Sequence, residues 1–185
     1  LIKEKTMKML AIFGFIFLSL SSFASNTQLK TVNYIEPARY MGTWYEIARY
    51  ENRFQKDCFA TKVNYALRDN GTIAVTNTCT LTKNPQEETT AHGIAFIANK
   101  ETNAQLEVGF APLFKYLGWF TGDYWVIKLG ANYEYAVIGT PNYKYFWIIA
   151  REKQISEALY QELVDFAVEQ GFDASKIVKS PTWNM

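Results

Sequence analysis

The stretch CFATKVNYALRDNGTIAVTNTC, residues 58–79, decides the fold class of this chain. From Phe59 to Leu67, the side chains at odd-numbered positions alternate with smaller or more polar ones at even-numbered positions. This two-residue period is typical of a β-strand whose two faces lie in different surroundings. The Asn70-Gly71 pair then predicts a tight turn into a second strand, which contains Ile73 and Val75. The stretch therefore predicts an antiparallel β-hairpin.

Six further segments resemble strands in their composition and in the turn residues that separate them. They are residues 44–50, 92–98, 105–110, 124–129, 133–139 and 143–151. Together with the hairpin they make eight strands joined by short connections, which is typical of an antiparallel meander. Because closure removes exposed edge strands, the sequence predicts an all-β fold, an eight-stranded antiparallel up-and-down β-barrel.

One segment near the C-terminal end changes to helical spacing. Ser156 can cap a helix in which Leu159, Leu163 and Phe166 recur at intervals of three and four, and Gly171 follows its end. A single helix cannot cover a sheet of eight strands, so we expect one C-terminal α-helix packed on the outside of the barrel. No internal repeat or linker divides the chain, which predicts a single domain.

Composition excludes two broad classes of protein. The 185-residue chain is 49% hydrophobic and 16% aromatic, so it can bury enough apolar surface to fold as one domain. Its formal net charge is +1, and it has no basic excess to neutralise phosphates. We therefore expect neither a wholly disordered chain nor a nucleic-acid partner.

Residues 1–24 have the form of a secretory signal peptide. Three lysines precede the apolar run 9–20, and Ser22-Phe23-Ala24 follows with small residues at both ends. The run is shorter than the roughly 20 residues that span a bilayer, although a retained membrane anchor is the alternative. We expect residues 25–36 to form an N-terminal extension and residues 37–180 to form the folded domain.

Cys58 and Cys79 are the only cysteines, and export to an oxidising compartment favours a disulfide between them. Counting outward from the hairpin turn places Cys79 opposite about Thr61, so the bridge requires a bulge or bend. Two buried free thiols are the alternative. Two cysteines and one histidine, His92, fall short of the usual four-ligand set, so we expect no metal site.

Three short motifs, taken in order, resemble the signatures of the lipocalin family. Gly42-Thr43-Trp44-Tyr45 followed by Asn52-Arg53-Phe54 is similar to the first signature. Thr121-Gly122-Asp123-Tyr124 resembles the second, and Arg151 at the end of the last predicted strand resembles the third. Three signatures across an eight-strand pattern are specific evidence, whereas a single Gly-x-Trp is not.

The resemblance covers residues 37–180 and points to one branch of the family. Segments 133–139 and 145–151 are similar to bacterial lipocalins, whose branch also includes apolipoprotein D and plant temperature-induced lipocalins. It implies that Trp44 lies under the closed end of the barrel and that Arg151 stacks across its ring, a cation–π contact of about 0.5–2 kcal/mol. The alternative is an ordinary core tryptophan and a surface arginine. The signature residues are expected to be structural: Gly42, Trp44, Asp123, Tyr124 and Arg151.

The resemblance also bears on localisation. Bacterial members of this branch are often lipoproteins of the outer membrane, whereas this chain has no cysteine near residue 24 to carry the lipid. This departure argues against outer-membrane anchoring. We expect a periplasmic or secreted protein after cleavage of the signal peptide, either a monomer or a homodimer.

Strand parity predicts which side chains line the barrel once Arg151 is placed inside. Phe146, Ile148 and Ala150 then face the helix. The expected cavity-lining residues are Val63, Tyr65, Ile73, Val75, Leu106, Val108, Phe110, Val126, Tyr145 and Trp147. Such a wall favours a fatty acyl chain, whose burial contributes about 0.8 kcal/mol per methylene. The alternative for each residue is that it fills a solid core, above all near the closed end.

The connection 112–120 is unusually apolar. We hypothesise that it lies beside the cavity mouth and contacts a membrane surface or the entering lipid, through Phe114, Lys115 and Trp119. The alternative is that this loop folds against the barrel.

The sequence favours a small-ligand carrier over other functions. The predicted ligand is a fatty acid or a lysophospholipid, bound for transport or storage during envelope maintenance or stress. The alternative is a protein-interaction module with a filled barrel. An enzyme is the least favoured function, because His92 has no serine or cysteine nucleophile motif beside it. No cofactor is expected.

Overall fold

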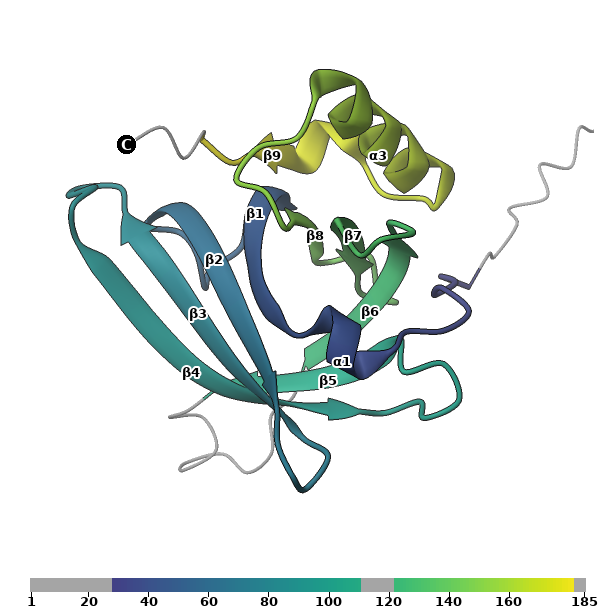
Figure 1. Ribbon diagram of the computed structural model, residues 1–185. Helices are drawn as coiled ribbons and strands as arrows, with labels where there is room; N and C mark the ends of the chain where they lie inside the picture. Colours follow the sequence, from purple (N-terminus) through teal and green to yellow (C-terminus); the bar gives the residue numbers. More distant parts are fainter. Residues whose placement is uncertain (1–27, 111–121, 182–185) are drawn as a thin grey trace, which may run out of the picture.

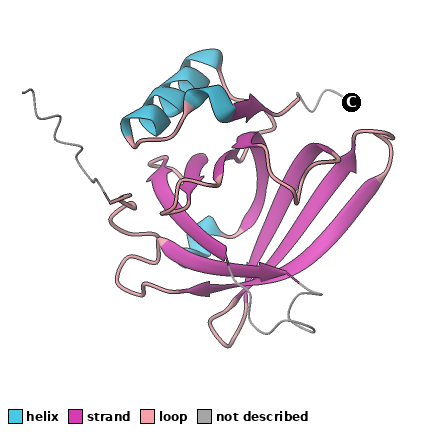
Figure 2. Ribbon diagram, turned by 180° about the vertical axis from the view of Figure 1, so that it is seen from behind, coloured by secondary structure: helices cyan, strands magenta, loops and turns pink. Residues whose placement is uncertain are grey.

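A computed structural model of the chain describes residues 28–110 and 122–181. The predicted signal peptide, residues 1–24, and the predicted mouth residues Phe114, Lys115 and Trp119 lie outside the described residues. The described chain forms strands that curve around a common axis, with one helix packed on the outside (Figures 1 and 2). The elements are α1 (Pro37–Tyr40), β1 (Gly42–Tyr50), β2 (Cys58–Leu67), β3 (Ile73–Leu81), β4 (Glu88–Ile97), β5 (Gln105–Phe110), β6 (Gly122–Leu129), β7 (Tyr135–Gly139), β8 (Phe146–Ala150), α3 (Glu157–Glu169), the 3-10 helix η1 (Ala174–Lys176) and β9 (Ile177–Lys179).

The predicted barrel is confirmed. Each strand from β1 to β7 pairs with the next in antiparallel fashion, and β1 pairs with both β2 and β8, which closes the sheet. The helix α3 packs outside the wall on the side of β1, β7 and β8 (Figure 1). Ser156 caps it as predicted, because its side chain accepts a hydrogen bond from the amide of Leu159.

The β2–β3 hairpin follows its predicted register. Leu67 lies opposite Ile73, and the amide of Arg68 donates to the carbonyl of Thr72. Gly71 in the turn has a φ of +79°, a backbone conformation that costs glycine little. The Asn70-Gly71 signal therefore located this turn correctly.

The disulfide between Cys58 and Cys79 is also present, with the two Cα atoms 5.4 Å apart. Thr61 is the direct partner of Cys79, while Cys58 pairs with Leu81 across a bulge between Cys58 and Ala60. The bulge brings the two sulfur atoms together, as the count from the turn required.

Two strands are shorter than the sequence predicts. β7 begins at Tyr135 rather than at Tyr133, and β8 begins at Phe146 rather than at Tyr143. Tyr133 and Tyr143 have φ values of 62° and 56°, which belong to turns and not to strands. Their amides donate to carbonyls three residues earlier and close these turns.

A ninth strand was not predicted. β9 pairs with the end of β1, from Ala48 to Tyr50, after β1 has separated from β2. A bulge between Glu46 and Ala48 lies where β1 changes its partner. Before the bulge, Gly42–Tyr45 pairs with β2, and after it, Ala48–Tyr50 pairs with β9. Three residues are too few to show an alternating pattern, so sequence periodicity could not reveal β9.

The two faces of the wall bury two separate hydrophobic clusters. One lies inside the barrel around Trp44. The other lies between the wall and α3, and contains Phe146, Ile148 and Ala150 together with Leu163. The predicted parity of the last strand is therefore confirmed.

One end of the barrel is closed around Trp44. Its indole Nε1 donates to the carbonyl of Tyr40 in α1 at 2.8 Å, and the Arg151 guanidinium lies 3.8 Å from the ring centroid. Arg151 also donates to the carbonyls of Arg39 and Thr43, at 2.8 and 2.9 Å. The predicted cation–π stack is thus present, and it fastens α1 across this end.

We predict that Arg151→Met lowers the free energy of unfolding by about 1–3 kcal/mol, because it removes the stack and the charged donors to two carbonyls. Urea denaturation followed by circular dichroism measures the change. The control is Arg68→Met in the exposed β2–β3 turn, which should change stability little. Equal stabilities of the two variants would contradict the role of Arg151.

Removal of the disulfide should also destabilise the barrel. We expect Cys58→Ser with Cys79→Ser to lower the free energy of unfolding by about 2–4 kcal/mol, because the bridge closes a 21-residue separation. Thermal unfolding with and without reductant provides the measurement. A reductant effect on the double variant as large as that on the wild type would show that the bridge is not responsible.

Candidate functional site

The inner wall carries most of the residues predicted to line a cavity. Nine of them belong to the cluster inside the barrel, either buried or packed against it: Val63, Tyr65, Ile73, Val75, Leu106, Val108, Phe110, Val126 and Trp147. Tyr145 lies just before β8, and its ring stacks on that of Trp147 with 5.9 Å between centroids. The structure therefore brings the predicted residues together on one surface.

Several inward-facing side chains remain partly exposed. Val108 and Phe110 on β5 and Trp147 on β8 pack against the inner cluster, yet they are only half-buried. Their exposed parts form apolar surface that the described residues leave uncovered. Apolar surface on a concave inner wall is the usual lining of a site for a small hydrophobic molecule.

The closed end of the barrel is packed with side chains. Trp44 is fully buried there, and Val126 and Ile138 are fully buried in the same inner cluster. The cavity near Tyr40 and Leu106 has a volume of only about 10 Å³, enough for a single water molecule. The residues nearest the closed end therefore act as a solid core, which was the alternative for them.

Three tyrosine hydroxyls meet above this floor. Tyr65 donates to the hydroxyl of Tyr124 at 2.9 Å, and the hydroxyls of Tyr40 and Tyr124 are 3.0 Å apart. Burial raises the pKa of all three phenols above the usual value, so they stay uncharged at physiological pH. The deep part of the barrel is consequently apolar, with neutral hydrogen-bonding groups.

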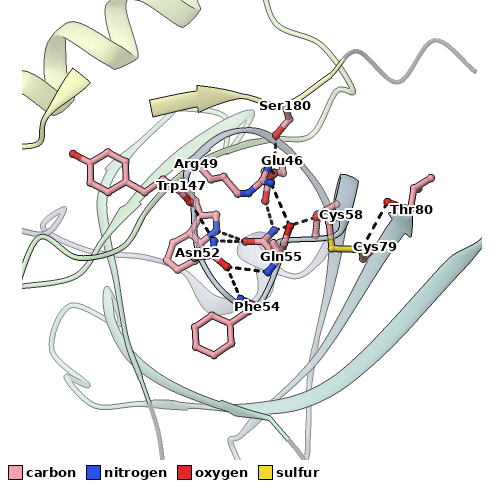
Figure 3. Close-up of polar contacts among 12 residues, drawn as sticks. Glu46, Arg49, Asn52, Phe54, Gln55, Cys58, Cys79, Thr80, Trp147 and Ser180 are labelled. Carbon is pink, nitrogen blue, oxygen red and sulfur yellow. Dashed lines mark hydrogen bonds and ion pairs between the residues drawn. A yellow bond between two sulfur atoms is a disulfide. The ribbon is translucent and has the colours of Figure 1, made fainter. Parts of the chain in front are cut away.

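The opposite end of the barrel, its mouth, carries a buried ionic network (Figure 3). Glu46 and Arg49 on β1 form an ion pair at 2.8 Å. The Gln55 amide donates to the second carboxylate oxygen of Glu46 and to the hydroxyl of Thr61. Trp147 donates its indole N–H to the Gln55 amide oxygen at 3.0 Å. This network joins β1, β2 and β8 to the β1–β2 loop, residues 51–57.

The β1–β2 loop has its own support. Asn52 accepts hydrogen bonds from the amides of Phe54 and Gln55, and its side chain donates to the Gln55 side-chain oxygen at 2.8 Å. The Phe54 side chain stays largely exposed and lies 5.9 Å from the ring of Tyr145. Phe54, Tyr145 and Trp147 therefore form an aromatic row at the mouth.

The sequence pattern did not predict Glu46, Arg49 and Gln55 as site residues. Glu46 shares the parity of Trp44, and this was the available signal for an inward side chain. The bulge after Glu46 then changes the parity for Arg49, and no local pattern predicts that bulge. The position of Gln55 depends on contacts with Glu46 and Trp147 that are distant in sequence from one another.

Two signature residues have contrasting surroundings. Gly42 has a φ of +93°, and a Cβ atom there would approach an Arg151 guanidinium nitrogen to 3.4 Å. Its backbone conformation and its place beside Arg151 both favour glycine. Asp123 is exposed at the start of β6, opposite Glu107.

A catalytic histidine, a metal site or a membrane-spanning helix among the described residues would indicate a different function. His92 is exposed on β4, with its Nδ1 atom 3.4 Å from the hydroxyl of Thr76. Within residues 28–110 and 122–181, no group of three or more histidine, cysteine or acidic side chains could hold a metal ion. No helix in these same ranges is long and apolar enough to cross a membrane.

Comparison with known proteins identifies close relatives. Residues 35–182 match the lipocalin-like domain. Temperature-induced lipocalin-1 of Arabidopsis thaliana is 40% identical over 157 residues, which are 83% of each chain. The outer membrane lipoprotein Blc of Escherichia coli K12 is 34% identical over 167 residues, which are 89% of each chain.

Solved structures show the same fold at lower identity. Insecticyanin from the tobacco hornworm Manduca sexta aligns with a TM-score of 0.63 and 18% identity, covering 85% of this chain and 86% of its own. This likeness supports the architecture, while the sequence relatives and the domain match establish descent. The chain belongs to the lipocalin family, in the branch that contains Blc, apolipoprotein D and temperature-induced lipocalin.

Proposed function

We propose that this lipocalin binds fatty acids or lysophospholipids for transport or storage in the bacterial cell envelope. Membership of the lipocalin family supports the general function, which is binding of a small hydrophobic ligand. The observation that carries the proposal is the uncovered apolar surface of Val108, Phe110 and Trp147 on the inner wall.

The gradient of polarity inside the barrel supports a single-chain amphiphile. The deep part offers apolar side chains and neutral phenols, which suit methylene groups and leave an anion without a balancing charge. The mouth offers the ionic network around Glu46 and Arg49, which suits a polar head group. An eight-stranded barrel has room for one small ligand, and each buried methylene adds about 0.8 kcal/mol.

The proposed location rests on two observations. Residues 1–24 have the form of a signal peptide, and one relative carries the name outer membrane lipoprotein. We infer that the protein acts in the periplasm or after secretion, in envelope maintenance or stress, as a binding protein rather than an enzyme.

A protein-interaction module is the second candidate. The full burial of Trp44, Val126 and Ile138 in the inner cluster favours it, because a completely filled barrel would leave only the loops for binding. Lipid binding by the purified protein distinguishes the two candidates.

We predict that delipidated protein binds the hydrophobic fluorophore N-phenyl-1-naphthylamine at a single saturable site and that oleate displaces it. Val108→Trp should weaken both ligands at least tenfold, because the larger side chain occupies space that several methylenes would fill. Fluorescence titration measures both affinities. The control is Val168→Trp on the exposed side of the outer helix α3, which should bind as the wild type does. Unchanged binding by Val108→Trp would place the ligand elsewhere.

Native mass spectrometry of freshly purified protein should show one bound lipid, with the mass of a fatty acid or a lysophospholipid. The physical reason is that a ligand with most of its chain buried dissociates slowly. Protein that carries no lipid and also fails to bind added lipid would favour the interaction module.

A further inference from the structure

We propose that Arg49 recognises the head group of the bound lipid, by donating its Nε–H to a carboxylate or phosphate oxygen at the barrel mouth. This inference rests on the proposed function and adds to it the position and chemistry of the ligand's polar end. The ligand lies with its head at the mouth and its acyl chain toward Trp44.

The guanidinium of Arg49 has one donor without a partner. One terminal nitrogen donates to Glu46 at 2.8 Å, and the other lies 3.4 Å from the carbonyl of Gln55. The Nε atom is buried and is the one buried side-chain polar atom among the described residues with no hydrogen-bond partner. Only 9% of the residue is exposed, so bulk water does not satisfy this donor. An unsatisfied N–H on a buried cation is costly, and an acceptor supplied by a ligand would remove that cost.

The register of β1 places Arg49 on the inner side of the wall. Its direct partner on β8 is Trp147, whose ring packs against the cluster inside the barrel. The next residue, Tyr50, belongs to the outer cluster and hydrogen-bonds the backbone of Asp173. Because neighbouring residues in a strand face opposite sides, Arg49 faces inward. Figure 3 shows Arg49 between Trp147 and Glu46.

The opposite end of the barrel is a poorer place for the head group. Its cation, Arg151, lies across the floor tryptophan and already donates to the carbonyls of Arg39 and Thr43. The hydroxyls that face the chamber there belong to neutral tyrosines. The negative charge of a carboxylate or phosphate is therefore better compensated at the mouth, where Arg49 supplies a charged hydrogen-bond donor.

The pairing with Glu46 sets the kind of recognition that Arg49 can provide. The carboxylate of Glu46 offsets the charge of Arg49 and also accepts a hydrogen bond from Ser180 at 2.6 Å. Long-range attraction for anions is thereby reduced, and the remaining contribution is a directional hydrogen bond from Nε. Fatty acids and lysophospholipids both carry an oxygen that can accept it.

The test compares ligands with and without an acceptor oxygen. Arg49→Lys keeps a cation for Glu46 and removes the Nε–H. We expect it to weaken binding of oleate and oleoyl-lysophosphatidylethanolamine about tenfold or more, as loss of a charged hydrogen bond implies. Binding of N-phenyl-1-naphthylamine, which has no oxygen, should change much less. The matched control is Arg68→Lys in the exposed turn at the other end, which should bind all three ligands as the wild type does.

The outcomes separate the possible sources of the acceptor. Weakening of oleate alone assigns the contact to a carboxylate, and weakening of the lysophospholipid alone assigns it to a phosphate. Equal loss for all three ligands would mean that Arg49 only holds the β1–β2 loop in place, and this would overturn the proposal, as would wild-type affinities throughout. Failure of the wild type to bind either lipid would overturn the proposed function as well.

A second measurement on the wild type does not depend on the folding of a variant. In the nitrogen-15 NMR spectrum, the Nε–H signal of Arg49 should move downfield and exchange more slowly with water when oleate saturates the protein. N-phenyl-1-naphthylamine should leave both properties nearly unchanged. An unaltered Arg49 signal at saturation with oleate and with the lysophospholipid would overturn the proposal.

Discussion

Closure of the sheet at β1 is the constraint on which the rest of this structure depends. On one side, β1 pairs with β2 from Gly42 to Tyr45 and then with β9 from Ala48 to Tyr50. On the other side, it pairs with β8 from Tyr45 to Arg49. The bulge after Glu46 accompanies this change of partners. One strand thereby supplies both Trp44 at the closed end and Arg49 at the mouth, so the two ends of the interior have opposite character.

That contrast explains how one barrel can suit an amphiphile. At the floor, Trp44 is fully enclosed, and the cation of Arg151 stays beneath its ring. At the mouth, the ion pair of Glu46 and Arg49 lies on the inner wall and is held by Gln55. Burial of an ion pair stabilises a fold weakly unless its hydrogen bonds are satisfied, and here one donor is left over. We interpret this mouth as built for a ligand as well as for stability.

Sequence reasoning predicted the local features and missed the long-range ones. The Asn70-Gly71 turn, the bulge required by the cysteine pair and the inward parity of the wall all follow from periods of two residues or from counting along one hairpin. The mouth network could not be predicted in this way, because Glu46 meets Ser180 across 134 positions and Trp147 meets Gln55 across 92. Aromatic residues also misled the prediction at Tyr133 and Tyr143, where a left-handed backbone overrides their preference for strands.

In the proposed binding mode, a single lipid lies inside this barrel with its head at the mouth. A crystal structure of the protein saturated with oleate tests it most directly. We expect continuous density for one acyl chain against Val108, Phe110 and Trp147, with the carboxylate within hydrogen-bond distance of the Arg49 Nε atom. Density for the chain on the outer wall, or an interior filled by side chains alone, would contradict it.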